Sequence, residues 1–420
     1  MSERVTSFHN EKGPLMPIAL LALAIGAFGI GTTEFVVTGL LPEFEAEYGV
    51  STPVAGFTAS GYALGVVVGA PLMAILGGRT ARKRLLMLMM VLFTVGNALS
   101  AVAPEFWVLL AGRVVSSLAH GAFFGVGSVV AAQLVGPTRR ASAIALMFTG
   151  LTVANVVGVP AGTLLGQQVD WRLTFAVVAG IGVLALAGIA ALVPAGAGDA
   201  PAAGRATGGG VRRELAAFRE PQVLLAMAMT VLGFGGVFAA ITYIAPMMTD
   251  AAGYAESSVT WLLALFGVGL VVGNLVGGRY ADRALMPMLY VSLTALAVAL
   301  ALFTLTAGDK VGAAVTLPLI GAFGFATVPP LQKRILDNAA DAPTLASAVN
   351  IGAFNLGNAL AAWLGGLVLS AGGGPTTPNL VGAAMAAGAL VLAVLGATLE
   401  RRRRLGRPAA PEPTRATART

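Results

Sequence analysis

Long apolar runs separated by short polar turns make up the hydrophobic pattern of this chain. The first run, LMPIALLALAIGAFGIGTTEFVVTGLL at residues 15–41, holds one charged residue. About 20 apolar residues suffice for a helix to cross the hydrocarbon of a bilayer. The runs lack the alternation of barrel strands, and only helices and closed barrels satisfy their backbone in lipid. The pattern therefore predicts an all-α polytopic membrane protein.

Twelve such runs follow one another, with approximate limits 15–41, 53–77, 85–103, 106–135, 141–166, 173–193, 222–248, 257–277, 285–307, 311–332, 343–371 and 378–399. The first is too long for the apolar region of a cleaved signal peptide, so we expect a retained first span. One long polar interruption follows the sixth run. The expected units are an N-terminal tail (1–14), a six-helix bundle (15–193), a linker (194–221), a second six-helix bundle (222–400) and a basic tail (401–420).

The linker begins rich in Pro, Gly and Ala, a composition typical of a flexible connection. Its stretch VRRELAAF, residues 211–218, also fits a short amphipathic helix with Val211, Leu215 and Phe218 facing the membrane surface. The tail RRRRLGRPAAPEPTRATART is typical of a disordered anchor at the membrane surface.

The distribution of charge predicts the orientation. The chain is 57 % hydrophobic and 11 % charged, and both tails, the linker and the even-numbered loops hold 23 of its 26 Lys and Arg. Because Lys and Arg favour the cytoplasmic side, we expect both termini in the cytoplasm. The net charge of +7 then reflects topology, and no nucleic-acid partner is expected. The absence of cysteine excludes disulfides and thiolate metal sites.

The two halves match each other when one is shifted by 204 residues. GVVVG at 65–69 then lies on GLVVG at 269–273, and Arg79 lies on Arg283. The glycines of both stretches have the G-x-x-x-G spacing that lets helices approach closely. Two repeated halves about a linker predict a major facilitator fold with a substrate site at the midplane between them.

Further motifs are spread over residues 15–400: GTTEFVVTGLLPEF (31–44), GYALGVVVGAP (61–71), GRVVSSLAHGAFFGVGSVVAAQLV (112–135), TVANVVGVPAGTLLG (152–166), WRLTF (171–175) and FNLGNALAAWLGG (354–366). Together they resemble the twelve-span drug:proton antiporter family of the major facilitator superfamily. The resemblance is strongest to its arabinose-efflux-permease (AraJ-like) group and related chloramphenicol and purine efflux proteins. It implies a bacterial plasma-membrane transporter that exchanges a small molecule for protons by alternating access.

That family has a turn motif, roughly G-x-x-x-D-R-x-G-R-[KR], between spans 2 and 3. Here Arg79, Arg82 and Lys83 take its basic positions, but Gly78 stands where the motif has Asp. The second half keeps the motif's first part as Gly278, Asp282 and Arg283. The resemblance implies that this Asp and Arg latch neighbouring helix ends. The first-half turn keeps either a basic anchoring role or positive-inside topology alone.

Charged residues within spans are costly and usually functional. Glu34 in the first span and Arg113 in the fourth lie at similar depths, roughly 10–12 Å below the outer surface at 1.5 Å per residue. We interpret Glu34 as the proton-coupling carboxylate and Arg113 as a charge that adjusts its pKa; the alternative is a permanent ion pair that fixes the two spans. His120, two turns from Arg113, either relays protons or is a packing histidine. The resemblance supports Arg113, which matches the basic residue of the family's span 4 motif.

The fifth span carries Gly150, Gly158, Pro160, Gly162 and Gly166. Proline kinks a helix, and glycines supply a flat packing face. These residues match the family's antiporter motif imperfectly, because Val159 separates Gly158 from Pro160. The resemblance implies a bend against the opposite half that favours exchange, and ordinary tight packing is the alternative.

Polar and aromatic residues of other spans are candidates for lining a substrate cavity. The polar ones either face a cavity or bond a neighbouring helix, and they are Tyr62, Asn155, Tyr243, Asn274, Asn355 and Asn358. Phe123, Phe124 and Phe238 either form an apolar wall for a lipophilic compound or pack in the core.

These features favour proton-driven export of a small lipophilic drug or metabolite. A proton-coupled sugar or nucleoside exporter is the alternative, although the polar side chains available for such a site are few. An enzyme is not expected, since the chain has two His and neither a metal-ligand cluster nor a phosphate-binding loop. The expected partners are the substrate, protons and the bilayer; no cofactor or metal is expected, and the protein is expected to be a monomer.

Overall fold

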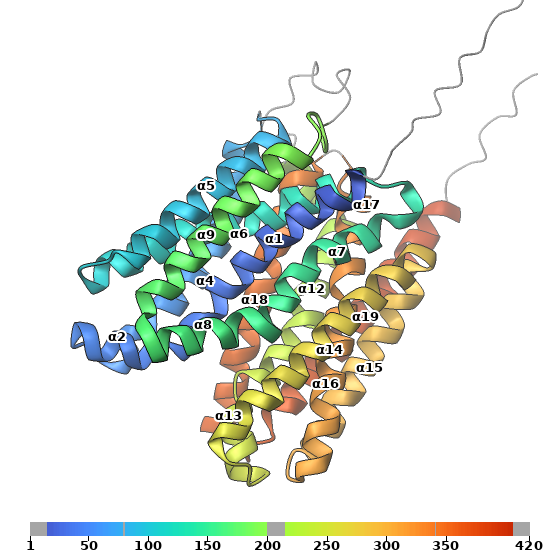
Figure 1. Ribbon diagram of the computed structural model, residues 1–420. Coiled ribbons are helices and arrows are strands. Elements are labelled where there is room, and N and C mark those ends of the chain that lie inside the picture. The colour runs from blue at the N-terminus through green and yellow to red at the C-terminus, as the bar shows by residue number, and fades with distance from the viewer. Residues whose placement is uncertain (1–14, 79, 200–214, 341, 406–420) are drawn as a thin grey trace, which may run out of the picture.

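The computed structural model describes residues 15–78, 80–199, 215–340 and 342–405, and their regular structure is helical. Eleven continuous helical runs in these ranges are long and apolar enough to cross a membrane, and one of them, Pro137–Leu192, has 56 residues. That run crosses twice, because its backbone becomes extended at Asp170 (φ −165°, ψ 128°) and reverses there (Figure 1). The predicted twelve-helix membrane fold is therefore confirmed for the described residues.

The first half forms one bundle of six crossings. Its elements are α1 (Leu15–Val36), η1 (Val37–Gly39), α2 (Leu41–Tyr48), α3 (Thr52–Ala55), α4 (Phe57–Leu76), α5 (Arg82–Ala101), α6 (Phe106–Gln133), η2 (Pro137–Arg139), α7 (Arg140–Val153), η3 (Ala154–Gly158), α8 (Val159–Leu165), η4 (Gly166–Asp170) and α9 (Trp171–Leu192). The fifth crossing combines α7, η3, α8 and η4, and two of these pieces, η3 and η4, are π-helical turns. The first π-helical turn ends two residues before Pro160, so the helix widens just ahead of the residue that removes a backbone donor.

The second half forms the other bundle. Its elements are η5 (Ala217–Arg219), α12 (Pro221–Ile241), α13 (Ile244–Pro246), η6 (Met247–Ala251), α14 (Glu256–Arg283), α15 (Leu285–Thr306), α16 (Lys310–Ala326), α17 (Val328–Asn338), α18 (Pro343–Ser370) and α19 (Pro378–Leu405). The tenth crossing is interrupted at Thr327, since Pro329 and Pro330 occupy the first turn of α17. Aspartates start two helices: Asp170 accepts a hydrogen bond from the Arg172 amide, and Asp309 from the Gly312 amide.

The described parts of the linker, residues 194–199 and 215–221, lie at one end of the molecule, together with residues 77–78, 80–81 and 134–139; we call this the linker end (Figure 1). The opposite end, which carries α2 and α13, is called the far end (Figure 1). Of the expected amphipathic helix, Val211 lies outside the described residues, Leu215 is exposed, and Phe218 packs beside Ala74 and Leu345.

Glycine pairs bring equivalent helices together in both bundles. Gly65 and Gly69 of α4 face α6, where Cβ atoms added to them would overlap Ser117 and Leu118. Gly269 and Gly273 of α14 face α16, where added Cβ atoms would overlap the carbonyls of Pro318 and Ala322. In each half the second crossing therefore packs directly on the fourth, the close approach that G-x-x-x-G spacing permits. This shared packing supports the duplication inferred from the sequence.

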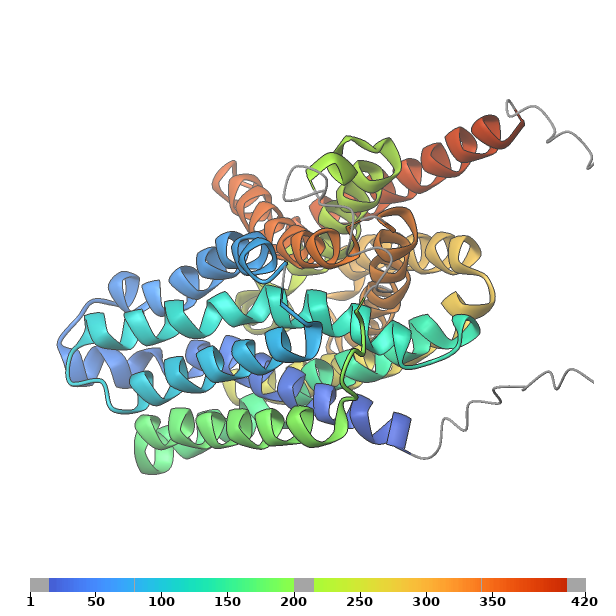
Figure 2. The same cartoon turned by 90° about the horizontal axis from the view of Figure 1, so that it is seen from above.

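The two bundles meet along α7 with α14, and along α18 with α4 and α6. Small residues line the meeting surface near the linker end, where Gly278 packs against Ala145 and Gly125 packs against Ala348. We call this surface the seam. The blue-to-green N-terminal helices and the yellow-to-red C-terminal helices lie side by side in Figure 2, and in Figure 1 their far ends point apart. The bundles thus contact each other at the linker end and diverge toward the far end.

We expect Gly273→Leu to destabilise the fold by about 3 kcal/mol or to prevent folding, because the new side chain would overlap the Ala322 carbonyl of α16. The measurement is the apparent melting temperature and monodisperse yield of the purified protein in detergent. Gly180→Leu is the control, since no heavy atom lies within 4 Å of a Cβ added there. Equal behaviour of the two variants would contradict the packing argument.

Candidate functional site

Four titratable or aromatic side chains predicted from the sequence come together inside the N-terminal bundle. They are Glu34 of α1, Tyr62 of α4, and Arg113 and His120 of α6, and we call them the Glu34 cluster. The Tyr62 hydroxyl lies 3.3 Å from His120 Nδ1, and Glu34 Oε2 lies 3.9 Å from the same nitrogen. The Arg113 guanidinium carbon lies 4.3 Å from the centre of the Tyr62 ring. His120 Nδ1 thus lies between the carboxyl and the tyrosine, and the ring tautomer decides whether this nitrogen donates or accepts a hydrogen bond.

Burial within the cluster is uneven. Arg113 is fully buried, Tyr62 and His120 are nearly so, and the Glu34 side chain retains 16 % of its accessible surface. Glu34 is therefore the member that a proton or a bound molecule can reach most directly.

Backbone carbonyls and a hydroxyl, rather than a carboxylate, hold Arg113. Its Nη1 donates to the Thr33 carbonyl at 2.7 Å and to Thr33 Oγ1 at 2.9 Å, and its Nε donates to the Thr58 carbonyl at 3.2 Å. Between the described residues Glu34 and Arg113 there is no ion pair within 4.0 Å; the ion-pair contact of Glu34 is with His120. These oxygens accept from Nη1 and Nε without cancelling the positive charge, and Nη2 is buried without a hydrogen-bond partner among the described residues. The permanent Glu34–Arg113 pair considered from the sequence is therefore not the arrangement observed.

Sequence reasoning missed three residues that support this cluster: Thr33, Thr58 and Asn97. Thr33 Oγ1 donates to Asn97 Oδ1 at 2.6 Å, a bond that joins α1 to α5, and Asn97 Nδ2 donates to the Phe93 carbonyl of its own helix at 2.8 Å. Each is a polar residue in an apolar run, and Thr33 immediately precedes Glu34. Polarity alone could have flagged them, but no local pattern identifies their partners.

A second buried arginine lies in the C-terminal bundle. Arg334, which the sequence assigns to a loop, is 5 % exposed because α17 continues the tenth crossing to Asn338. Its Nη2 donates to Gln222 Oε1 at 3.0 Å, and Gln222 Nε2 donates to the Gly396 carbonyl at 3.0 Å. These bonds join α17, α12 and α19 near the linker end.

Of the remaining cavity candidates, Phe124 reaches the Glu34 cluster, with its ring centre 5.2 Å from that of His120. Phe123 is fully buried against Gly26, Phe124 stacks on Phe148, and Phe238 packs on Phe234. The amide groups of Asn155 and Asn355 bond carbonyls of their own helices, and the Asn358 Oδ1 atom is buried without a hydrogen-bond partner. Tyr243 donates to the Ala362 carbonyl at 2.6 Å, and Asn274 donates across the seam to the Ala145 carbonyl at 2.6 Å. Most of these residues therefore pack or bond helices together.

The glycines of the fifth crossing face the same bundle rather than the opposite one. Cβ atoms added at Gly150, Gly158 and Gly162 would meet Ala24, Thr32 and Val36 of α1, and one at Gly166 would meet Leu40. Spacings of four and eight residues place these glycines on one helix face, and that face packs on α1. The expectation of a glycine-lined bend against the other half is corrected accordingly. Contact with the other bundle comes instead from other residues of this crossing, such as Val156 against Gly267 and Ala145 against Gly278.

The second-half turn binds the first half directly. Asp282 Oδ1 accepts a hydrogen bond from the Ala141 amide at 2.7 Å, and Oδ2 accepts one from the Ser142 amide at 2.9 Å. These are first-turn amides of α7, so a carboxylate of one bundle caps a helix of the other, where the helix dipole also favours negative charge. Gly278 lies one turn earlier in the same contact, and Arg283 lies over the Tyr280 ring.

The first-half turn makes different contacts. Arg82 Nε donates to Thr344 Oγ1 of α18 at 2.9 Å, and Lys83 Nζ donates to the Ala190 carbonyl at 2.7 Å. Arg79 lies outside the described residues.

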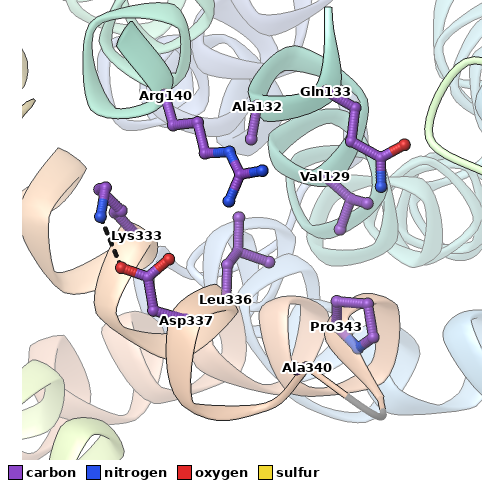
Figure 3. Close-up of a pocket in the computed structure, with 9 residues that line it drawn as sticks. All are labelled: Val129, Ala132, Gln133, Arg140, Lys333, Leu336, Asp337, Ala340 and Pro343. Carbon is purple, nitrogen blue, oxygen red and sulfur yellow. Dashed lines mark hydrogen bonds and ion pairs between the residues drawn. The ribbon is translucent and has the colours of Figure 1, made fainter. Parts of the chain in front are cut away.

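A cavity of about 210 Å³ lies in the seam at the linker end, between α6, α7, α17 and α18 (Figure 3). The Arg140 guanidinium points into it from the N-terminal bundle, while Lys333 and Asp337 of the other bundle bind each other at 2.5 Å. In the described ranges no three His, Asp or Glu side chains gather as metal ligands.

Two six-helix bundles, joined by a linker and closed against each other at one end, define a membrane transporter of the two-bundle class. The chain belongs to the Major Facilitator Superfamily, whose sequence profile matches residues 23–351. This confirms the family predicted from the motifs, a family of transporters rather than enzymes.

Individual relatives match over most of their length. The chain is 48 % identical to the inner membrane transport protein YdhP of Escherichia coli (strain K12) over 379 residues, covering 90 % of this chain and 95 % of YdhP. It is 38 % identical to a chloramphenicol resistance protein of Streptomyces lividans over 381 residues, again covering 90 % and 95 %. The crystal structure of the E. coli fucose:proton symporter FucP superposes with a TM-score of 0.73 at 18 % identity, covering 90 % of this chain and 98 % of FucP, and this likeness shows the fold.

Replacement of Thr33 by Val is expected to destabilise the protein by about 1–3 kcal/mol, because Arg113 and Asn97 both lose a buried hydrogen-bond partner. Thermal melting in detergent measures the effect. Thr38→Val is the matched control, since the exposed Thr38 hydroxyl bonds the Phe35 carbonyl of its own chain segment. A Thr33 variant as stable as the Thr38 variant would show that this hydroxyl does not support Arg113.

Proposed function

We propose that this transporter exports a small lipophilic molecule, a drug or a metabolite, in exchange for protons by alternating access. The observation that carries the proposal is Glu34, a carboxyl in an apolar span that contacts His120 beside a fully buried arginine. Ionisable groups inside membrane spans are costly and typically mark proton or ion pathways. Binding of a proton or of substrate next to Glu34 would change the relative stability of the two transporter states.

The polar inventory favours a lipophilic substrate over a sugar or a nucleoside. Several Asn and Tyr side chains that such a polar substrate would need already bond helix carbonyls. The relative named as a chloramphenicol resistance protein supports export of a small drug-like compound. A panel of drugs and metabolites, tested for resistance or export in a pump-deficient bacterial host, identifies the substrate and decides between the two alternatives.

The proposed orientation places the linker end in the cytoplasm of a bacterial cell, because Lys and Arg concentrate in the loops and tails of that side. The far end, where the bundles diverge, then faces outward. During transport the seam would open at the linker end, and the Asp282 caps on α7 would be released.

Glu34→Gln is expected to reduce proton-gradient-driven transport to the level of protein-free liposomes, because an amide cannot exchange a proton. The measurement is substrate accumulation in proteoliposomes with an imposed pH gradient, using a compound found in the panel. Glu45→Gln on α2, outside the apolar spans, is the control and should transport normally. Unchanged gradient-driven transport by the Glu34 variant would exclude the coupling role.

His120→Phe fills the same space but removes the nitrogen next to Glu34 and Tyr62. If His120 passes protons to Glu34, the variant should transport more slowly at a given gradient while melting at the same temperature. The double variant with Glu34→Gln should then be no slower than Glu34→Gln alone, since both changes interrupt one path. A normal transport rate for His120→Phe would assign this histidine to packing.

A further inference from the structure

The start of the linker is bound to the N-terminal bundle through Asp199. Helix α5 begins at Arg82, and its own N-cap residue, Ala81, supplies no side-chain hydrogen bond. Asp199 Oδ1 caps the helix instead, because it accepts a hydrogen bond from the Arg82 amide at 3.0 Å. The same oxygen also lies 3.7 Å from Arg82 Nη1, within ion-pair distance. The Asp199 side chain is 11 % exposed. A residue 117 positions away along the chain thus caps the third crossing and binds its first side chain.

The backbone before Asp199 is shaped for this contact. Gly196 and Gly198 have φ angles of 79° and 82°, a region that L side chains rarely adopt. The Asp199 amide donates to the Gly196 carbonyl at 3.0 Å, which closes a turn. A Cβ at Gly198 would lie 2.7 Å from Val130 Cγ2 and 2.8 Å from Arg82 Cδ, so the turn packs tightly against α6 and α5. Residues 194–199 are therefore a folded part of the bundle.

Arg82 connects this turn to the other bundle. Its Nε donates to Thr344 Oγ1 at 2.9 Å, and Thr344 lies in the first turn of α18. One arginine therefore touches the linker, the start of α5 and the start of α18. Its carboxylate partner fixes the side chain, and fixing it reduces the entropy lost when the bond to Thr344 forms.

The equivalent hydrogen-bonded contact between the bundles, which we call a joint, uses different residues in the second half. There Asp282, in the last turn of α14, the second crossing of that bundle, caps α7, the fifth crossing of the other bundle. In the first half the position that corresponds to Asp282 is Gly78, and the joint to α18, the fifth crossing of the C-terminal bundle, is made by Arg82. The two joints are related by the internal repeat, and both cross the seam at the linker end.

We propose that Asp199 is a positioning residue for alternating access. It supplies from the linker the carboxylate that the first-half turn lacks, holds Arg82 against Thr344, and so stabilises the state that is closed at the linker end. This inference rests on the proposed alternating-access mechanism. When the linker end opens, the Arg82–Thr344 bond breaks, while Asp199 and Arg82 stay together on the N-terminal bundle.

The test measures the distance between the far ends of the bundles. The chain contains no cysteine, so Glu105→Cys and Gly308→Cys introduce two unique spin-label positions in far-end loops of the N- and C-terminal bundles. In lipid nanodiscs without substrate, pulsed electron paramagnetic resonance gives the populations of long and short distances. We expect Asp199→Ala to raise the ratio of short to long distances roughly fivefold to tenfold, the effect of losing one charge-assisted hydrogen-bonded joint.

Asp309→Ala is the matched control, because Asp309 also caps a helix start but lies in the far-end loop before α16, away from the seam. It should leave the ratio unchanged. Thr344→Val should shift the ratio in the same direction as Asp199→Ala, and the double variant should shift it no further than the larger single change. If Asp199→Ala cannot be purified in a folded state, Asp199→Asn replaces it: the amide oxygen can still cap α5 but no longer carries charge for Arg82.

An unchanged ratio in the Asp199 variants, an equal shift in Asp309→Ala, or additive shifts with Thr344→Val would each overturn the proposal. The distance measurement needs neither substrate nor a proton gradient. Failure of the proposed proton coupling would appear as normal transport by Glu34→Gln, and it would leave these distances unaffected. The two proposals can therefore fail separately.

Discussion

The burial of Arg113 is the constraint on which the N-terminal bundle depends. A buried guanidinium is costly unless its donors are hydrogen-bonded, and here Nη1 and Nε bond Thr33 of α1 and Thr58 of α4. The third nitrogen, Nη2, is buried without a hydrogen-bond partner among the described residues. These bonds set the rotation and height of two helices relative to α6. Because Glu34 follows Thr33 directly, the same bonds determine where the carboxyl lies, and it lies beside His120. The arginine thus positions the candidate proton site without pairing with it.

The two bundles share an architecture, but their buried polar residues have different roles. The N-terminal bundle holds the carboxyl, the histidine and the tyrosine in one network, whereas the buried arginine of the C-terminal bundle, Arg334, joins three helix ends to one another. In the proposed mechanism, a change in protonation at Glu34 would be transmitted to the C-terminal bundle through the seam. The seam is suited to this role because its packing surfaces are small residues, such as Gly278 and Gly125, joined by a few specific hydrogen bonds. Such contacts can form together when the seam closes and break together when it opens.

The first- and second-half turns both bind the fifth crossing of the opposite bundle, but they do so with different residues. In one, Asp282 caps the opposite helix directly; in the other, Arg82 reaches the opposite helix and a linker carboxylate holds Arg82. The sequence predicted the acid–base difference between the turns from Gly78 and Asp282, and it left the role of the first turn open between anchoring and topology. Asp199 was not identified as its partner, because nothing in a Pro-, Gly- and Ala-rich segment indicates which helix start it meets.

The sequence by itself determined the number of crossings, the two repeated halves, the family, and the presence of Glu34, Arg113 and His120 within the spans. It could do so because a bilayer imposes a fixed thickness and a strong penalty on charge, and both leave their record in local composition. The tertiary structure alone decided that Glu34 contacts His120, that Thr33 and Asn97 support Arg113, and that the fifth-crossing glycines face α1. It also decided that Asp199 caps α5. These outcomes depend on the rotation of each helix about its axis and on partners tens to more than a hundred residues apart, which hydrophobic runs of uniformly apolar helices do not encode.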